Sequence, residues 1–500
     1  MTATDKGGEQ PVREPSLADA IIPLVVLVVL IGGAIALFGL DALAGPIPAA
    51  LVVCALFTGV IVLKNGHSWK DIENASSRAI GSVSSAIFIL LAVGALIGTW
   101  CLSGAIPTLV YYGIRILSPG WYFAAAALIC GVIAMSVGSS WTTAGTIGVG
   151  LVGIASMLGV STTITAGAVI SGAYLGDKLS PLSETTIMTS QMAKVDVYEH
   201  IKRQAWTSIP AFLIGLVLFS LLGLRGPEVP GIDTGMELKE LDQVYNITFV
   251  NLLPLAVLIV LSLRKVPATL SLMAAAILAG VMAPITQPDI VRGFAGEPGI
   301  GLVHAGLRAM WKAIATGFSI DSGFADIDRL LSRGGMYRML VTLWLVMGAV
   351  TFGSLLHEFG LVKRLIDPLV RSAKGTGLLF LTVFGSAFGL NIFTGDQYIA
   401  LVLPARTFGA EFAKRGLAPT NLSRLCADCG IVTSPLVPWN SCGAFMGAVL
   451  GVPTLLYLPF CFFNIASPLL SVVFGFTGFK IEKTEPHDPG TTSAPTEAAA

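Results

Sequence analysis

Long apolar stretches separated by short polar ones dominate this chain. They include residues 21–40, 209–224, 250–282, 339–350 and 455–476. A helix that crosses a bilayer needs roughly 20 mostly apolar residues. The pattern therefore predicts an all-α polytopic membrane protein with about 10–12 membrane segments.

Composition supports this prediction. Apolar residues make up 54% of the chain, charged residues only 12%, and the mean hydropathy is +0.80. A soluble domain carries about 25% charged residues, so most of this surface is expected to face lipid. The first 19 residues are polar and lack the short apolar core of a signal peptide. We therefore expect the first apolar stretch to be a retained helix.

Two Ser-Pro-Leu triplets, 180–182 and 434–436, lie 254 positions apart, about half the length of the chain. The same offset relates Gly94 to Gly348 and Gly131 to Gly385. Matching polar interruptions in two halves are typical of transporters built from an internal repeat. The sequence thus predicts two repeats, residues 20–225 and 247–478.

Loop charges indicate how the two repeats are oriented. Lysine and arginine in short loops favour the cytoplasm. The turn at 41–48 has neither, whereas the equivalent turn of the second half carries Arg264 and Lys265. The basic loop 194–203 likewise corresponds to the neutral stretch 448–453. In each comparison a loop without Lys or Arg in one half corresponds to a basic loop in the other half. This difference predicts two inverted-topology repeats.

Inverted repeats fix the expected position of the remaining segments. Both termini would be cytoplasmic, as a polar tail at 1–19 and a disordered tail at 479–500. The acidic linker 226–246 would lie outside the cytoplasm. Segment 321–338 fits this scheme poorly, because it carries three arginines and is expected outside.

Each half contains a polar segment flanked by apolar stretches too short for full spans. In the first half, residues 136–146 lie between the apolar stretches 122–134 and 147–158. This arrangement predicts a re-entrant hairpin, whose irregular tip must be buried in protein or line an aqueous cavity. The matching segment of the second half places Asp396 opposite Thr142 at the repeat offset.

Each half then runs into its Ser-Pro-Leu triplet. Proline lacks an amide hydrogen and disfavours helix in the preceding residue, so Pro181 and Pro435 are expected to interrupt helices. Freed carbonyl groups and small polar side chains offer the hard oxygen ligands that suit Na⁺. The expected neutral ligands are Thr142, Thr143, Ser180, Ser183, Ser434 and Asn440.

Four carboxylates lie in these clusters: Asp177, Glu184, Asp396 and Asp428. Ionisable groups inside a membrane are costly and are functional candidates by default. A carboxylate in low-dielectric surroundings favours a bound H⁺ or cation, so competition at one carboxylate is enough for exchange. We expect Na⁺ at Asp177 and Asp396, with Asp428 as a third candidate.

Structural alternatives stand beside these assignments. Asp177 could pair with Lys178 or cap the helix break, and Glu184 could simply be favoured at a helix N-terminus. Lys178 could be a fixed internal cation or could extend to the membrane interface. Cys426 and Cys429 form a CxxC pair, which supplies only half of a structural zinc site, and no cofactor is expected.

These clusters resemble the motifs of the NhaC family of Na⁺/H⁺ antiporters. The resemblance is carried by residues 138–146, 167–174, 176–186, 395–398, 422–424 and 433–441, and it extends over about residues 20–478. It implies an inverted-repeat ion-transporter fold with paired hairpins and broken helices. The family also includes proteins similar to malate/lactate exchangers and amino acid carriers, so it defines cation coupling better than cargo.

The leading hypothesis is a secondary Na⁺/H⁺ antiporter of the bacterial cytoplasmic membrane. The second is a carrier of an organic acid or amino acid coupled to Na⁺ or H⁺. An enzyme is disfavoured because no His-Glu-x-x-His, Gly-x-Ser-x-Gly or phosphate-loop motif is present. Expected partners are Na⁺, H⁺, the bilayer, an organic solute in the second hypothesis and a second copy in a homodimer, but not nucleic acid.

Overall fold

The structure is a computed structural model that describes residues 12–225, 234–297 and 299–484. Within these ranges the regular elements are helices, and the only extended pairing is an isolated bridge between Leu417 and Lys483. Much of the predicted N-terminal tail, the start of the predicted linker and residues 485–500 of the predicted disordered tail lie outside the described residues.

Residues 12–225 form eleven α-helices, most of which follow an apolar or amphipathic stretch. They are α1 (Leu17–Phe38), α2 (Pro46–Lys64), α3 (Trp69–Ser82), α4 (Ser84–Leu102), α5 (Ala105–Ile116), α6 (Tyr122–Val137), α7 (Ser140–Thr143), α8 (Val149–Met157), α9 (Thr162–Leu179), α10 (Glu184–Ala193) and α11 (Val197–Arg225).

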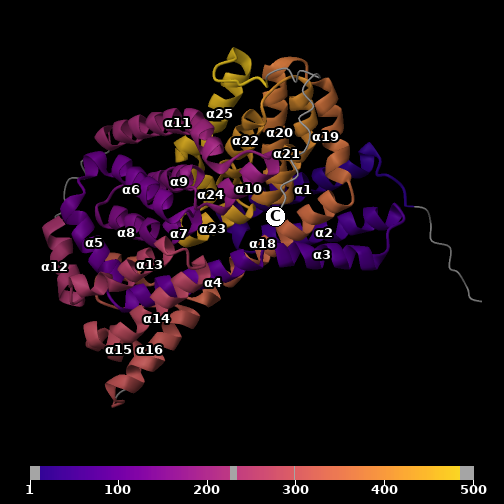
Figure 1. Cartoon of the computed structure of the whole chain (residues 1–500). Helices are drawn as coiled ribbons and strands as arrows, with labels where there is room; N and C mark the ends of the chain where they lie inside the picture. The colour runs from indigo at the N-terminus through magenta and orange to yellow at the C-terminus, as the bar shows by residue number, and fades with distance from the viewer. Residues whose placement is uncertain (1–11, 226–233, 298, 485–500) are drawn as a thin grey trace, which may run out of the picture.

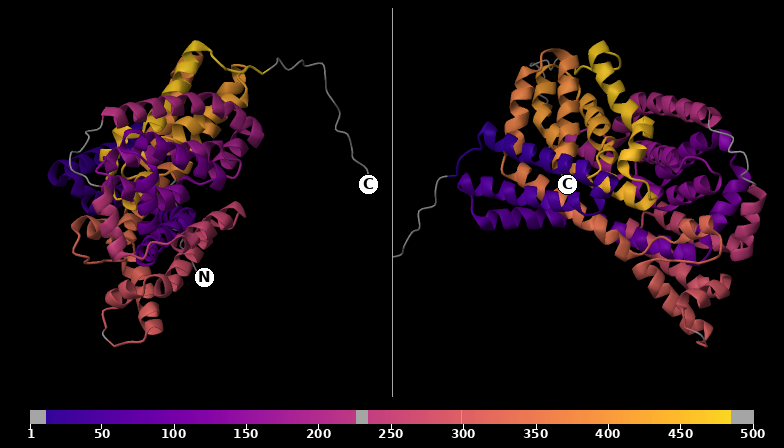
Figure 2. Two further views of the ribbon diagram at one scale, coloured as in Figure 1. Left: turned by 90° about the vertical axis from the view of Figure 1, so that its left-hand side faces the viewer. Right: turned by 180° about the vertical axis from the view of Figure 1, so that it is seen from behind.

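The second half continues the all-helical pattern. Its helices are α12 (Thr234–Val244), α13 (Leu253–Leu263), α14 (Ala268–Thr286), α15 (Pro288–Ala295), α16 (Leu302–Thr316), α17 (Ala325–Leu331), α18 (Met336–Glu358), α19 (Leu361–Ser372), α20 (Gly375–Thr394), α21 (Gln397–Lys414), α22 (Pro419–Cys426), α23 (Ser441–Leu450), α24 (Thr454–Tyr457) and α25 (Phe462–Thr477). Figures 1 and 2 show α14–α16 on one side of the molecule and α19–α22 with α25 on the opposite side.

Eight helices among the described residues are long and apolar enough to cross a membrane. Two bent pairs, Leu238–Val244 with Phe249–Leu263 and Ser441–Leu450 with Thr454–Phe460, raise the number to as many as ten. Large apolar side chains such as Val29 and Leu37 are exposed on these helices, which is the pattern of a lipid-facing surface. The prediction of an all-α polytopic membrane protein is confirmed.

Helix order in the second half follows that of the first half at the predicted offset. Shifting α4, α6 and α10 by 254 positions gives the ends of α18, α20 and α23 to within three residues. The opposite orientation of the two halves in the membrane stays a prediction.

At both predicted tips a left-handed glycine is followed by a polar cap. The preceding segments, Pro119–Val137 and Gly375–Thr394, are long and apolar enough to cross a membrane, contrary to the expectation of short stretches, and the re-entrant course stays a prediction. Gly138, with φ +74°, ends α6, and the Ser139 hydroxyl accepts a hydrogen bond from the Thr142 amide at 3.2 Å. Gly395, with φ +64°, ends α20, and Asp396 caps α21. Any other residue at Gly138 would also collide with Leu182, 2.8 Å from an ideal Cβ. In Figure 1, α6 and α8 lie on the same side of α7, so the chain reverses direction at this tip.

Both Ser-Pro-Leu triplets lie between helical segments. Helix α9 ends at Leu179, and α10 begins at Glu184 after its cap Ser183. In the second half, a π-helical turn at Ala427–Ile431 and a 3₁₀ turn at Ser434–Leu436 precede α23. The backbone is therefore irregular at the same relative place in each half.

Small residues hold α9 close to α6. An added Cβ at Gly172 would lie 2.0 Å from the Ala127 carbonyl oxygen, and one at Gly176 would lie 2.4 Å from that of Gly131. Such close backbone approach is a common way to pack membrane helices. It fixes the end of α9, the helix that carries Asp177 and Lys178.

Residues 480–484 pack against the loop between α21 and α22. The Ala418 amide donates to the Glu482 carbonyl at 3.0 Å, and the Thr484 amide donates to that of Gly416 at 3.0 Å. The first residues of the predicted disordered tail, 479–500, therefore hydrogen-bond with the rest of the protein.

Candidate functional site

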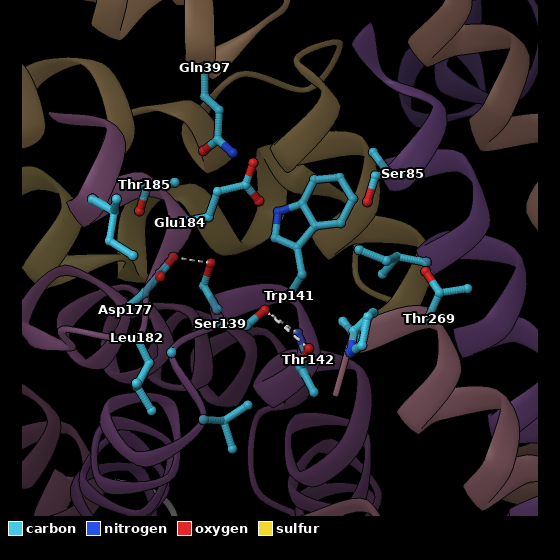
Figure 3. A pocket seen from close by; sticks show the side chains of 18 of the residues that line it. Ser85, Ser139, Trp141, Thr142, Asp177, Leu182, Glu184, Thr185, Thr269 and Gln397 are labelled. Carbon is cyan, nitrogen blue, oxygen red and sulfur yellow. Dashed lines mark hydrogen bonds between the residues drawn. The ribbon is translucent and has the colours of Figure 1, made fainter. Parts of the chain in front are cut away.

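A cavity of about 520 Å³ opens between segments of both halves. Buried residues such as Asp177 and Asp396 form its floor, and exposed residues such as Ser85 and Lys265 form its rim. Figure 3 shows part of the lining. The polar residues of its lining are Ser139, Ser140, Thr142, Asp177, Glu184, Thr185, Asp396, Gln397, Tyr398 and Ser441 at the hairpin tips and breaks, and Ser82, Ser85, Ser262, Lys265 and Thr269 towards the rim. The two tips and the first break thus meet around one space.

Asp177 joins the first hairpin tip to the first helix break. Its side chain is only 5% exposed. One carboxylate oxygen accepts a hydrogen bond from the Ser140 hydroxyl at 2.8 Å, and the other accepts one from the Ser183 hydroxyl at 2.5 Å. Because Ser183 also caps α10, movement of the break would change the surroundings of this carboxylate.

Asp396 lies at the second hairpin tip and is 3% exposed. Its Oδ1 atom accepts hydrogen bonds from the amides of Tyr398 at 2.6 Å and Ile399 at 3.4 Å. Within the described ranges, Oδ2 accepts no hydrogen bond from protein. One oxygen therefore orients the carboxylate, while the other is available to a ligand in the cavity.

Two further polar side chains face the same space. Gln397 is 7% exposed, and its amide makes no hydrogen bond with the part of the chain that the structure describes. Glu184 begins α10 and lines the cavity as an exposed carboxylate. Figure 3 shows Gln397, Glu184 and Asp177 on one side of Trp141, with Ser85 and Thr269 on the other.

Asp428 lies elsewhere, in a buried ion pair with Lys178. The Oδ1 atom of Asp428 also accepts from Gln204 at 2.8 Å and Ser467 at 2.6 Å, and Oδ2 accepts from Thr207 at 2.9 Å and from Ser471. Neither member of the pair lines the cavity. Lys178 therefore binds Asp428 from the second half rather than its neighbour Asp177 or the membrane interface.

The predicted neutral ligands divide in the same way. Thr142 lines the cavity, and Ser183 donates a hydrogen bond to Asp177. The other four do not line the cavity and form hydrogen bonds with other groups of the protein. Thr143 donates to the Ser139 carbonyl, Ser434 donates to the Ile431 carbonyl, Ser180 accepts from the Leu182 amide, and Asn440 contacts Asn391 and caps α23. Pro181 lines the cavity, while Pro435 lies in the 3₁₀ turn outside it.

Several residues of the site had no assigned role in the sequence prediction, among them Ser140, Gln397 and Lys265. Ser140 and Gln397 each open the helix that follows a tip, so proximity to the tip could have suggested them. Lys265 has a positive φ of 60° in the turn before α14, and nothing local indicates that it reaches this cavity.

The CxxC pair shows no metal-binding companions. Cys426 and Cys429 are buried free thiols. Within residues 12–225, 234–297 and 299–484, no three His, Cys, Asp or Glu side chains group as a metal site.

Sequence comparison decides the family. A sequence model of the Na⁺/H⁺ antiporter family matches residues 15–224 and 172–479. The chain belongs to the Na⁺/H⁺ antiporter family. The predicted resemblance to NhaC is confirmed, since the chain is 35% identical over 435 residues to the Na⁺/H⁺ antiporter NhaC of Alkalihalophilus pseudofirmus, covering 87% of this chain and 91% of that protein.

Other relatives of this chain are named for different cargoes. The chain is 34% identical to the arginine/ornithine antiporter ArcD of Halobacterium salinarum, over 98% of this chain and 97% of that protein. It is also 34% identical to the malate-2H⁺/Na⁺-lactate antiporter of Bacillus subtilis, over 93% of this chain and 96% of that protein. The chain thus belongs to a family of antiporters whose members are named for different cargoes.

Proposed function

We propose that this protein is a secondary Na⁺/H⁺ antiporter in which Asp177 and Asp396 exchange the two ions. The observation that carries the proposal is that these two carboxylates, one from each half, line one cavity while their side chains are almost fully buried. Buried carboxylates without a cationic protein partner favour binding H⁺ or a metal cation. Neither Asp177 nor Asp396 has a Lys or Arg partner among the described residues.

The exchange follows from competition at these groups. Na⁺ entering the cavity would bind the free Oδ2 of Asp396 and the Asp177 carboxylate, and the protons held there would leave. The hydroxyls of Ser140 and Ser183 donate to ionised Asp177 in the Na⁺-bound state, and Thr142 adds a neutral oxygen nearby. On the other side of the membrane, proton binding would release Na⁺.

The rim indicates which side the cavity faces. It is formed by the first residues of α4 and by Lys265–Thr269, which adjoin the basic segments 64–78 and 264–265. Basic loops favour the cytoplasm. We therefore place both termini in the cytoplasm of a bacterial cell and interpret the structure as an inward-open state. Alternating access would then require the cavity to close here and open on the opposite side.

The test is proton flux in proteoliposomes under an imposed Na⁺ gradient. We expect Na⁺ to drive proton movement, K⁺ and choline to drive little, and the double variant Asp177→Asn/Asp396→Asn to show only background flux. Asp289→Asn is the matched control, because this aspartate is 95% exposed and does not line the cavity. Undiminished Na⁺-driven flux in the double variant would refute the assignment.

The cavity volume favours a second candidate, an organic acid or amino acid carrier coupled to Na⁺ or H⁺. A space of about 520 Å³ is within the range of small-molecule pockets, roughly 300–1,000 Å³. The arginine/ornithine and malate/lactate relatives make organic cargo plausible for this chain. Flux of protons that requires an organic solute, with none under Na⁺ alone, would favour this candidate.

A further inference from the structure

We propose that the cavity also binds a small organic cation, bearing an ammonium or guanidinium group, in competition with Na⁺ and H⁺. The inference rests on the proposed function, because it uses the same cavity and the same carboxylates. Among the organic solutes that a cavity of this size could hold, it favours cations over anions.

Size is the first argument. The cavity measures about 520 Å³, whereas one water occupies about 30 Å³ of the liquid. A Na⁺ ion with a few bound waters would therefore occupy only a small part of the cavity. The volume suits a solute with several carbon atoms beside its charged group.

Charge is the second argument. Three carboxylates line the cavity, Asp177, Glu184 and Asp396, and Lys265 is the one Lys or Arg among the lining residues that the structure describes. Asp177 and Asp396 belong to the buried floor, whereas Lys265 is exposed at the rim. A dicarboxylate would meet like charges at the floor, which is a strong determinant against binding.

Unpaired polar atoms supply the third argument. The Oδ2 atom of Asp396 and the whole side-chain amide of Gln397 lack protein partners within the described residues, although both side chains are more than nine-tenths buried. Neither group is among the fully buried side-chain atoms that lack a partner, so both reach the surface of the cavity and are available to a ligand there. Their oxygens would accept the several N–H donors of an ammonium or guanidinium group.

An aromatic wall completes the site. Trp141 lines the cavity and stacks on Phe445 with ring centroids 4.1 Å apart and an interplanar angle of 15°. The stack holds the indole in place. An organic cation over the free side of this ring would gain a cation–π attraction that complements the carboxylates.

Lys265, exposed at the rim of the cavity, adds a second determinant of specificity. A solute with a cationic group at the floor and a carboxylate towards the rim would meet Lys265 there. We therefore expect a carboxylated amine to bind more tightly than a plain diamine of the same length.

The experiment measures thermal unfolding of the purified protein in detergent with L-ornithine, putrescine or L-malate at matched ionic strength. We expect both amines to raise the unfolding temperature, with apparent affinities at least about tenfold above that of malate. The ornithine shift should disappear in Asp396→Asn and persist in Asp289→Asn. Lys265→Asn, which tolerates the positive φ, should weaken ornithine but not putrescine.

Flux separates this inference from the function on which it rests. In proteoliposomes, ornithine should inhibit Na⁺-driven proton flux at concentrations at which malate does not. No stabilisation by either amine, or strongest stabilisation by malate, would overturn the organic-cation site even if Na⁺-driven flux is intact. Amine stabilisation that depends on Asp396, without any Na⁺-driven flux, would support the site and overturn only the Na⁺/H⁺ assignment.

Discussion

Asp177 and Lys178 are adjacent in sequence, yet they belong to two different polar regions. Asp177 faces the cavity and is held by two serine hydroxyls. Lys178 is bound to Asp428 in a closed cluster between the two halves, where both carboxylate oxygens are occupied by protein donors. Burial alone therefore does not mark a transport group. Both carboxylates accept hydrogen bonds from the protein, so the difference lies in the Lys178 cation that neutralises Asp428 and in the cavity that only Asp177 lines.

This comparison predicts opposite consequences for the two regions. Substitutions in the cavity should reduce transport with little effect on stability. Substitutions in the Lys178–Asp428 cluster should reduce stability with little effect on transport by the folded protein.

The largest expected effect is on transport by Asp177→Asn or Asp396→Asn alone. Each should lower the specificity constant for Na⁺ in proteoliposome flux by at least about 100-fold, because a neutral amide neither releases a proton nor matches the cation's charge. The unfolding temperature should change little. A variant that keeps near-normal flux would identify its aspartate as structural.

The next effect is on stability, in Asp428→Asn. Removing one member of a buried ion pair leaves an uncompensated charge and costs roughly 3–5 kcal/mol. We expect a clear fall in the unfolding temperature in detergent. The double variant Lys178→Met/Asp428→Asn removes both charges and should recover at least half of the loss.

Flux through that double variant sharpens the comparison further. Because neither residue lines the cavity, the folded fraction should retain Na⁺-driven proton flux. A folded double variant that does not transport would show that the ion pair takes part in coupling.

A smaller effect is expected from the hydroxyl donors to Asp177. Ser183→Ala or Ser140→Ala removes a hydrogen bond to a charged group, worth about 1.5–3 kcal/mol, and should raise the apparent KM for Na⁺ about tenfold or more. Ser434→Ala is the control, because its hydroxyl donates to the Ile431 carbonyl outside the cavity lining. Equal changes in all three variants would contradict the role of the two donors.

The smallest effect is expected for Glu184→Gln. Glu184 is exposed beside the cavity, so water and salt screen its charge. The apparent KM for Na⁺ should rise by less than about threefold at physiological salt and more at low salt. A complete loss of flux would place Glu184 with the exchanging carboxylates.

The sequence was informative wherever local chemistry determines structure. Apolar stretches located the helices, polar segments between apolar stretches located the interruptions after α6 and α20, and Pro181 and Pro435 located the breaks. Asp177 and Asp396 could be proposed for the same reason, because each directly adjoins such an irregularity.

Long-range partners could not be predicted in this way. Lys178 binds a carboxylate 250 positions away, and no local pattern distinguishes Asp428 from Asp177. The hydroxyls of Thr143 and Ser434 looked like ion ligands but bond to nearby carbonyls, an option open to any serine or threonine in a helix. Lys265 reaches the cavity only through the packing of the α13–α14 turn.

Proton release from the purified protein on Na⁺ addition tests the central claim most directly. In weakly buffered detergent solution, wild-type protein and Lys178→Met/Asp428→Asn should release protons when NaCl, but not KCl, is added. Asp177→Asn and Asp396→Asn should each release fewer, and the double Asp177→Asn/Asp396→Asn variant none. Undiminished Na⁺-induced proton release from that last variant would contradict the account.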